Sequence, residues 1–191
     1  MRVIGIDPGS RLTGWGVIDR TGNRLQGIAA GVIQANAQAP LHERLCAIYT
    51  SLKEVMVTYE PQVMAIEDLF FAAKYVQAAL TLGHARGVIL LAAAEKGLPI
   101  HSYAPAVVKR AIAGSGRAEK HQVARMVEGL LGWQKMMQPD TTDALAIALT
   151  HLSTHVARAV ATSATPLKTT ATQNRREPVQ RRSSLPRFRS R

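Results

Sequence analysis

Four acidic residues at three places in the sequence have the type and spacing that metal-dependent chemistry requires. Asp7 ends the first apolar run, and Glu67 ends a later one at residues 63–67. Asp140 and Asp143 lie three residues apart, which puts both on one face of a helix that begins by Asp140. Four carboxylates meeting at one point would raise one another's pKa values, and Mg²⁺ or Mn²⁺, which prefer oxygen ligands, would remove that cost.

Such a cluster could hold two ions and cut a phosphodiester bond without a side-chain nucleophile. Two neighbouring ions can activate a water, hold the phosphate and stabilise the leaving 3′ oxygen. Spacing alone also fits simpler roles. Asp7 precedes a Pro-Gly turn, Glu67 could be a solvated strand end, and Asp140 and Asp143 suit the start of a helix.

The patterning of apolar residues predicts the elements that would bring these acids together. The first three strands are joined by short turns and predict an antiparallel meander, and later strands alternate with helices, so we expect an α/β fold with a mixed sheet. Acids that end strands lie at the rim of such a sheet, where ligands bind. Strands are expected near 2–7, 15–18, 27–33, 63–67 and 99–103, and helices near 41–58, 76–96, 106–113, 118–131 and 142–159.

The charge of the chain favours a polyanionic partner. The formal net charge is +11, but it is unevenly distributed: from Pro166 onward there are eight Lys and Arg residues and one Glu. We therefore predict one domain over 1–160 and a basic, disordered tail over 161–191 that lacks apolar periodicity. The tail either adds salt-sensitive affinity for nucleic acid or has no role.

The remaining composition favours a cytoplasmic protein with no membrane segment. The single cysteine, Cys46, excludes an internal disulfide and is expected to pack in the core. The first residues lack the apolar run of a signal peptide, and the most apolar stretch, residues 87–94, is shorter than the roughly 20 residues that span a bilayer.

The helix expected over residues 76–96 predicts a homodimer. Residues 85–94 are apolar nearly all round, and Gly83 and Gly87 would allow close backbone approach. A second subunit is a natural cover, and a twofold dimer would present two sites. The alternative is a helix enclosed within one domain.

The motifs around the acids resemble those of RuvC-type resolvases. The resemblance covers roughly residues 1–155 and rests on GIDPGSRLTGWGVID, AIEDLFFAAK, LGHARGVILLAA, GSGRAEKHQV and PDTTDALAIALTH. It implies a ribonuclease H-like fold, with a mixed five-stranded sheet flanked by helices, and four metal-binding catalytic acids at Asp7, Glu67, Asp140 and Asp143. It also implies a homodimer that nicks a four-way junction symmetrically in recombination and repair, leaves 5′-phosphate and 3′-hydroxyl ends, and works with the RuvA–RuvB branch-migration complex.

The same resemblance implies a set of DNA contacts. An aromatic residue here is similar to one that stacks on unpaired bases in the family, and either Phe70 or Phe71 could supply it. Lys109 and Lys120 match basic positions near the DNA backbone, whereas Arg117 and His121 are weaker candidates. The expected contacts are Phe70, Phe71, Lys74, Lys109, Arg110, Arg117 and Lys120.

Three other functions are less consistent with the sequence. An actin-like or sugar-kinase-like ATPase would need a second phosphate loop, which the sequence lacks, and a longer chain. A ribonuclease H relative would not need the motifs around Phe70, Gly114 and Lys120. A DNA-binding module without activity would not depend on Asp7.

Overall fold

A computed structural model describes residues 1–69, 76–133 and 138–163 of the chain. Its centre is a single five-stranded sheet in the order β3-β2-β1-β4-β5. β1 pairs antiparallel with β2, and β2 with β3, whereas β4 is parallel to both β1 and β5. The mixed sheet and its antiparallel meander are therefore as expected. The strands are β1 (Arg2–Asp7), β2 (Leu12–Thr21), β3 (Arg24–Gln34), β4 (Val63–Glu67) and β5 (Ile100–Tyr103).

The second and third strands are longer than their apolar runs suggested. Their pairing continues from Leu12↔Gln34 to Thr21↔Arg24, with an irregularity at Val17/Ile18. Backbone pairing does not require apolar side chains, so polar residues at both ends belong to the ladder. The turn between the strands contains Gly22 at φ 59°, a conformation that suits glycine.

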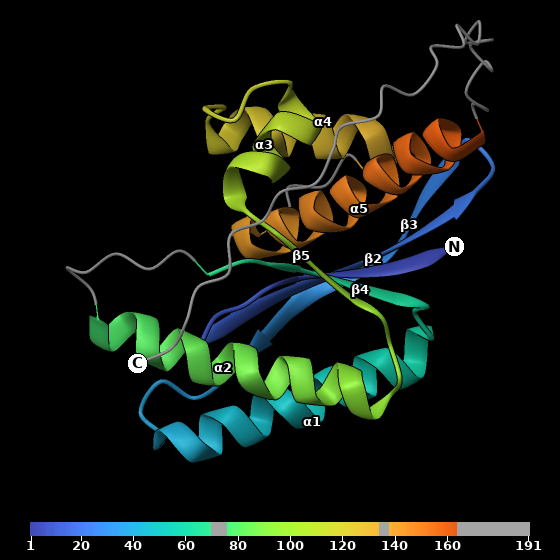
Figure 1. The fold of residues 1–191 in the computed structure, drawn as a ribbon. Coiled ribbons are helices and arrows are strands. Elements are labelled where there is room, and N and C mark those ends of the chain that lie inside the picture. Colours follow the sequence, from blue (N-terminus) through green and yellow to red (C-terminus); the bar gives the residue numbers. More distant parts are fainter. Residues whose placement is uncertain (70–75, 134–137, 164–191) are drawn as a thin grey trace, which may run out of the picture.

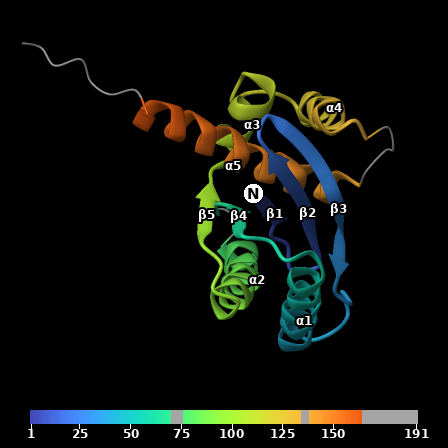
Figure 2. The ribbon, with the colours of Figure 1, turned by 90° about the vertical axis from the view of Figure 1, so that its right-hand side faces the viewer.

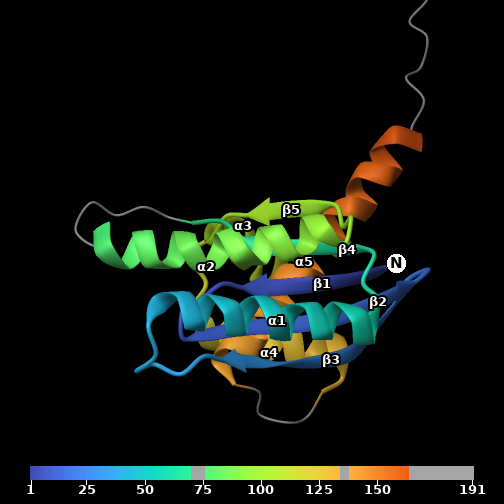
Figure 3. The same ribbon diagram turned by 90° about the horizontal axis from the view of Figure 1, so that it is seen from below.

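Helices cover both faces of the sheet (Figure 1). The views from the side and from below show α1 and α2 next to each other on one face, with α3, α4 and α5 on the other (Figures 2 and 3). The helices are α1 (Leu41–Tyr59), α2 (Val76–Glu95), α3 (Pro105–Ala113), α4 (Lys120–Leu131) and α5 (Pro139–Ser163).

Each face of the sheet has its own core, and alternation along the strands decides which side chains enter it. Ile4 and Ile6 of β1 pack with α1 and α2, whereas Val3 packs with α3, α4 and α5. Because successive side chains of a strand point to opposite faces, Asp7 lies on the Val3 face, toward α5. In β4, Ala65 belongs to the α5 core, which places Glu67 on that face as well.

The expectation that Cys46 packs in the core is wrong, since this residue is exposed. The buried stripe of α1 consists of Ile48, Leu52 and Met56. Cys46 is two residues from Ile48, and residues two apart do not share a helix face.

By length and composition, α2 is the one helix among the described residues that could cross a membrane. A core helix of a soluble protein passes the same test. The inward side chains of α2, Ala85, Ile89, Ala92 and Ala93, are buried in the core, but only 22% of its most apolar window is buried. Much of its apolar surface is therefore exposed in the single chain.

Candidate active site

Two adjacent parallel strands bring Asp7 and Glu67 to the same edge of the sheet. Ile6 is opposite Ile66 in the β1–β4 register, and each acid is the next residue of its strand. Because the strands are parallel and both side chains point toward α5, the carboxylates are neighbours. Strand direction and register thus join residues that are 60 positions apart in the sequence.

Two glycines allow α5 to approach the sheet closely enough to add its own acids. A Cβ atom on Gly5 of β1 would lie 2.0 Å from the Ala144 carbonyl oxygen. One on Gly14 of β2, which is opposite Asp7, would lie 2.0 Å from the Asp140 carbonyl oxygen. Only hydrogen fits at either position. The first turn of α5 therefore lies directly over the strand that ends in Asp7.

Three of the four acids line one cavity, and the fourth lies beside it. A cavity of about 260 Å³ is lined by Asp7, Glu67 and Asp143 together with Lys109 and Lys120. Asp140 lines a neighbouring hollow between α5 and the edge strand β3. Its charge still reaches the cavity, since it helps to raise the pKa of Asp7.

The carboxylates repel one another as the spacing predicted. Burial, followed by the charges of Glu67, Asp143 and Asp140, raises the pKa of Asp7 from 3.8 to about 8. The pKa of Glu67 is also raised, mainly by burial, although its hydrogen bond with Asp7 and the charges of Lys120 and Lys109 oppose the shift. Asp7 therefore keeps its proton to a higher pH than an isolated aspartic acid does.

A lysine occupies the space beside the third carboxylate. Lys120 Nζ donates a hydrogen bond to Asp143 Oδ2 at 3.0 Å, and this contact raises the pKa of the lysine. Lys120 is the first residue of α4, whose start is fixed by a capping box between Glu119 and Gln122. The start of α4 is thus fixed, with the ammonium group of Lys120 toward the cavity.

The donor set fits a hard divalent cation, although the side chains do not yet enclose one. Within residues 1–69, 76–133 and 138–163, no three His, Cys, Asp or Glu side chains form a ready ligand group. The hydrogen bond between Asp7 and Glu67 requires a proton on one of the two carboxyl groups, and the Lys120 ammonium group holds Asp143. Both are positive species that offset carboxylate charge, which is the role a divalent cation would take over.

Of the other residues expected to contact DNA, only some lie in the described part of the chain. Lys109 comes from α3 and lines the cavity. Arg110 and Arg117 are exposed, as is His121, which pairs with Glu119. Phe70, Phe71 and Lys74 fall outside the described residues.

Two arginines that the sequence pattern did not indicate hold the chain where β1 and β4 end. Arg44 of α1 donates two hydrogen bonds to the Ser10 carbonyl at 2.9 and 2.7 Å. Arg86 of α2 reaches the end of β4 at Glu67 and Asp68. A signal was present for Arg86, because a lone basic residue in an apolar helix requires a partner.

His151 of α5 lies in the interior of the protein. Its side chain is buried, and its Nδ1 lies 2.8 Å from the Tyr103 hydroxyl. Two turns of α5 separate it from Asp143, so it belongs to the packing of α5 against β5 and lies outside the cavity.

Comparisons with known proteins identify the family of the chain. Residues 3–151 match the family described as "Crossover junction endodeoxyribonuclease RuvC". The chain is 48% identical to the protein of that name from Sorangium cellulosum, over 87% of this chain and 93% of the relative. It is 47% identical to the one from Citrifermentans bemidjiense, over 79% and 92%.

Solved structures show the same fold. RuvC of Thermus thermophilus in complex with a Holliday junction substrate is 40% identical, with a TM-score of 0.75, over 80% of this chain and 93% of that one. The yeast mitochondrial Holliday junction resolvase Ydc2, at 13% identity and a TM-score of 0.56 over 78% and 77%, shares the fold alone. The expectation of a ribonuclease H-like fold is confirmed, since RuvC has that fold. With this match along nearly its whole described length, the chain belongs to the RuvC family of crossover junction endodeoxyribonucleases.

Proposed function

We propose that this protein is a structure-selective endonuclease that resolves Holliday junctions in recombination and repair. It cuts two opposed strands symmetrically near the crossover and leaves 5′-phosphate and 3′-hydroxyl ends. One observation carries the proposal: Asp7, Glu67 and Asp143 converge in a cavity whose wall also holds two lysines, in a chain of the RuvC family. Carboxylates beside lysines suit phosphodiester hydrolysis.

The four acids hold Mg²⁺, with two ions per site and Mn²⁺ as a substitute. The family is metal-dependent, and an all-carboxylate donor set suits hard cations. When bound, the ions would activate water and neutralise charge on the phosphate. The chain's own part is to hold Asp7, Glu67 and Asp143 at one point and to place Asp140 beside them through the α5 approach at Gly14.

The lysines bind the scissile strand. Lys109 and Lys120 flank the acids, so a phosphate that reaches the cavity meets both ammonium groups. Lys120 would exchange its contact with Asp143 for one with phosphate as cations neutralise that carboxylate. Arg110 and Arg117 are exposed and serve the DNA backbone farther out. Phe70, Phe71 and Lys74 remain predicted contacts.

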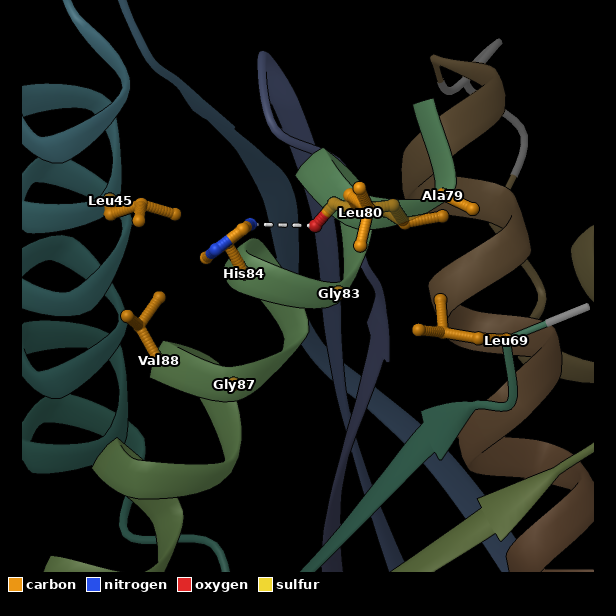
Figure 4. A pocket seen from close by; sticks show the side chains of 9 residues that line it. Leu45, Leu69, Ala79, Leu80, Gly83, His84, Gly87 and Val88 are labelled. Carbon is orange, nitrogen blue, oxygen red and sulfur yellow. Dashed lines mark hydrogen bonds between the residues drawn. The ribbon is translucent and has the colours of Figure 1, made fainter. Parts of the chain in front are cut away.

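A second copy of the chain covers the apolar surface of α2. A hollow runs along α2 between Leu45 of α1 and Leu69, which follows β4. Figure 4 shows Leu45 and Val88 on one side of Gly83 and Gly87, with Leu80 and Leu69 on the other. The volume of the hollow is about 560 Å³. A Cβ atom on Gly83 or Gly87 would meet nothing within 4 Å, so the helix backbone is open to a partner. A twofold dimer would place two sites on a roughly twofold junction.

Three further parts of the proposal rest on the family and on charge. The RuvA–RuvB branch-migration complex is the expected partner, and the cytoplasm is the expected compartment. The tail from residue 161 adds salt-sensitive affinity, which a chain truncated after Thr165 would lose at low salt. Equal binding by the truncated and full chains would leave the tail without this role.

A comparison of substrates tests the proposed function. The protein is incubated with Mg²⁺ and a four-way junction, a linear duplex of the same sequence, or an RNA–DNA hybrid. We expect paired nicks in the junction, whose ends a ligase reseals, and little cutting of the duplex. Preferential cutting of the hybrid would instead indicate a ribonuclease H activity, and no cutting of any substrate would indicate a binding module.

A further inference from the structure

Arg86 is the one Lys or Arg residue in α2, and it lies against the sheet. Its side chain is only 17% exposed. A guanidinium that is withdrawn from water requires partners to offset the loss of hydration. Its partners lie at the end of the strand that carries Glu67.

The guanidinium contacts three acceptors at one corner of the sheet. Nη2 donates to Ser102 Oγ at 2.7 Å and to Asp68 Oδ1 at 3.4 Å, and Nε donates to the Glu67 carbonyl oxygen at 3.4 Å. Ser102 lies on β5, opposite Ile66 of β4. The side chain therefore joins α2 to both parallel strands at the point where β4 ends.

This contact bears on the direction of the Glu67 side chain. Glu67 is the last residue of β4, and the next two residues, Asp68 and Leu69, are exposed. A further hydrogen bond at this turn runs from the Asp68 amide to the Tyr103 carbonyl at 2.9 Å. Arg86 adds a fixed point on the carbonyl of Glu67 itself, so the peptide plane that follows the carboxylate cannot rotate freely.

We propose that Arg86 is a positioning residue that fixes Glu67 for metal binding. This inference rests on the proposed function, in which Glu67 is a metal ligand. Contacts of this kind, one step removed from a metal, typically change metal affinity about 10- to 100-fold. Arginine suits the role because its planar fork reaches several acceptors at once, which a lysine ammonium does with less geometric control.

The sign of the effect separates positioning from simple electrostatics. Arg86 is a cation near a cation site, and its removal also leaves the charge of Asp68 unpaired. If charge alone mattered, loss of Arg86 would strengthen divalent metal binding. If Arg86 positions Glu67, its loss weakens metal binding in spite of the more favourable field.

The experiment titrates the full-length protein with MnCl₂ by isothermal calorimetry, without DNA, and repeats this for Arg86→Ala, Arg86→Lys and Ser102→Ala. We expect metal affinity to fall about 10- to 100-fold in Arg86→Ala. It should fall less in Arg86→Lys and in Ser102→Ala. The melting temperature of metal-free Arg86→Lys should stay near that of the unchanged protein. In junction cleavage, the Mg²⁺ concentration for half-maximal rate should rise while the rate at saturating Mg²⁺ largely recovers.

Arg20→Ala is the matched control. Arg20 also clamps backbone carbonyls, those of Leu152 at 2.9 Å and Gly22 at 2.8 Å, but at the opposite end of β2 from the residue that pairs with Asp7. Its metal affinity should be unchanged. Unchanged or tighter metal binding in both Arg86→Ala and Arg86→Lys would overturn the inference, as would an equal loss in Arg20→Ala.

A titration of Glu67→Gln with MnCl₂ distinguishes a failure of the positioning role of Arg86 from a failure of the proposed metal site. If Glu67→Gln weakens metal binding and the Arg86 variants do not, only the positioning role fails. If Glu67→Gln binds metal as well as the unchanged protein, the proposed metal site itself is wrong.

Discussion

At the scale of single residues, the site depends on carboxylates that are partly withdrawn from water and forced together. All four acids are half-buried, and the pKa of Asp7 is raised to about 8 by burial and by its neighbours. At neutral pH and without bound metal, the negative charge of the Asp7 carboxylate is therefore disfavoured. A metal-free site therefore holds a proton and an ammonium group where the working site is expected to hold cations.

The substitutions Asp7→Asn and Glu67→Gln should reduce junction cleavage and leave junction binding intact. Each change removes a proposed cation ligand and leaves the lysines of the cavity in place. Junction cleavage should fall at least about 100- to 1000-fold, the size of loss seen when one catalytic electrostatic contact is removed. Junction affinity, measured by gel shift without metal, should be retained, and a folded variant that loses both would contradict the assigned roles.

The raised pKa of Asp7 also predicts how stability depends on pH. Between its ordinary pKa of 3.8 and about 8, the folded metal-free protein binds more protons than the unfolded chain does, so its free energy of unfolding should fall as pH rises through this window. Asp7→Asn lacks this contribution. In EDTA, its melting temperature should exceed that of the unchanged protein at pH 8 by more than at pH 5.

Saturating Mg²⁺ should reduce that difference, because bound cations replace the proton on the carboxylates. If the melting temperatures of Asp7→Asn and the unchanged protein in EDTA differ by the same amount at pH 5 and at pH 8, the pKa of Asp7 is not raised.

At the scale of elements, the close approach of α5 to the antiparallel strands positions half of the acids. Gly14 lies under the carbonyl of Asp140, and Gly5 lies under that of Ala144. Neither contact has a signal in the apolar pattern of the sequence. A glycine within a strand indicates only that something comes near.

Gly14→Ala should therefore impair both stability and cutting. Its Cβ atom would lie 2.0 Å from the Asp140 carbonyl oxygen, so the first turn of α5 has to move away. Overpacking of this kind costs about 1–3 kcal/mol, and cleavage should fall further than the loss of folded protein explains. Thermal melting and cleavage at a temperature well below the transition would measure the two effects.

Gly129→Ala is the control for that change. Gly129 lies on α4, where a Cβ atom would meet nothing within 4 Å, so alanine should be neutral or slightly stabilising. If Gly14→Ala behaves like Gly129→Ala, the approach of α5 does not limit the site.

At the scale of the whole molecule, the two faces of the sheet have separate cores and carry different features. One face carries α3, α4 and α5 with the acids and lysines, and the other carries α1 and α2 with exposed apolar surface. The proposed catalytic face and the proposed dimer face are thus separate, so association need not obstruct the cavity.

Leu80→Glu should disrupt the proposed dimer and the pairing of nicks. Leu80 is 54% exposed and lines the hollow of Figure 4. Light scattering should show a monomer at concentrations where the unchanged protein is a dimer. On a supercoiled plasmid that extrudes a cruciform, single nicks that relax the plasmid should replace paired nicks that linearise it.

Leu130→Glu provides the comparison, since Leu130 is 45% exposed but lies on α4. It should remain dimeric and linearise the plasmid. A monomeric Leu130→Glu together with a dimeric Leu80→Glu would move the interface to the other face.

The sequence by itself determined the strands that end in Asp7 and Glu67, the helix that carries Asp143, and the family. These are local properties, because apolar runs, Pro-Gly turns and motif order are all written along the chain. The exposed Cys46 was misjudged because an apolar neighbourhood in sequence does not reveal which side of a helix meets the sheet.

Only the tertiary structure decided that the acids meet. The β1–β4 register sets Asp7 beside Glu67, two glycines admit α5, and α4 directs Lys120 at Asp143. Arg86 reached its place in the same way, through packing of α2 on strands from two other parts of the chain. Such contacts join residues far apart in sequence, and their geometry depends on strand register and helix packing, which the local sequence pattern does not encode.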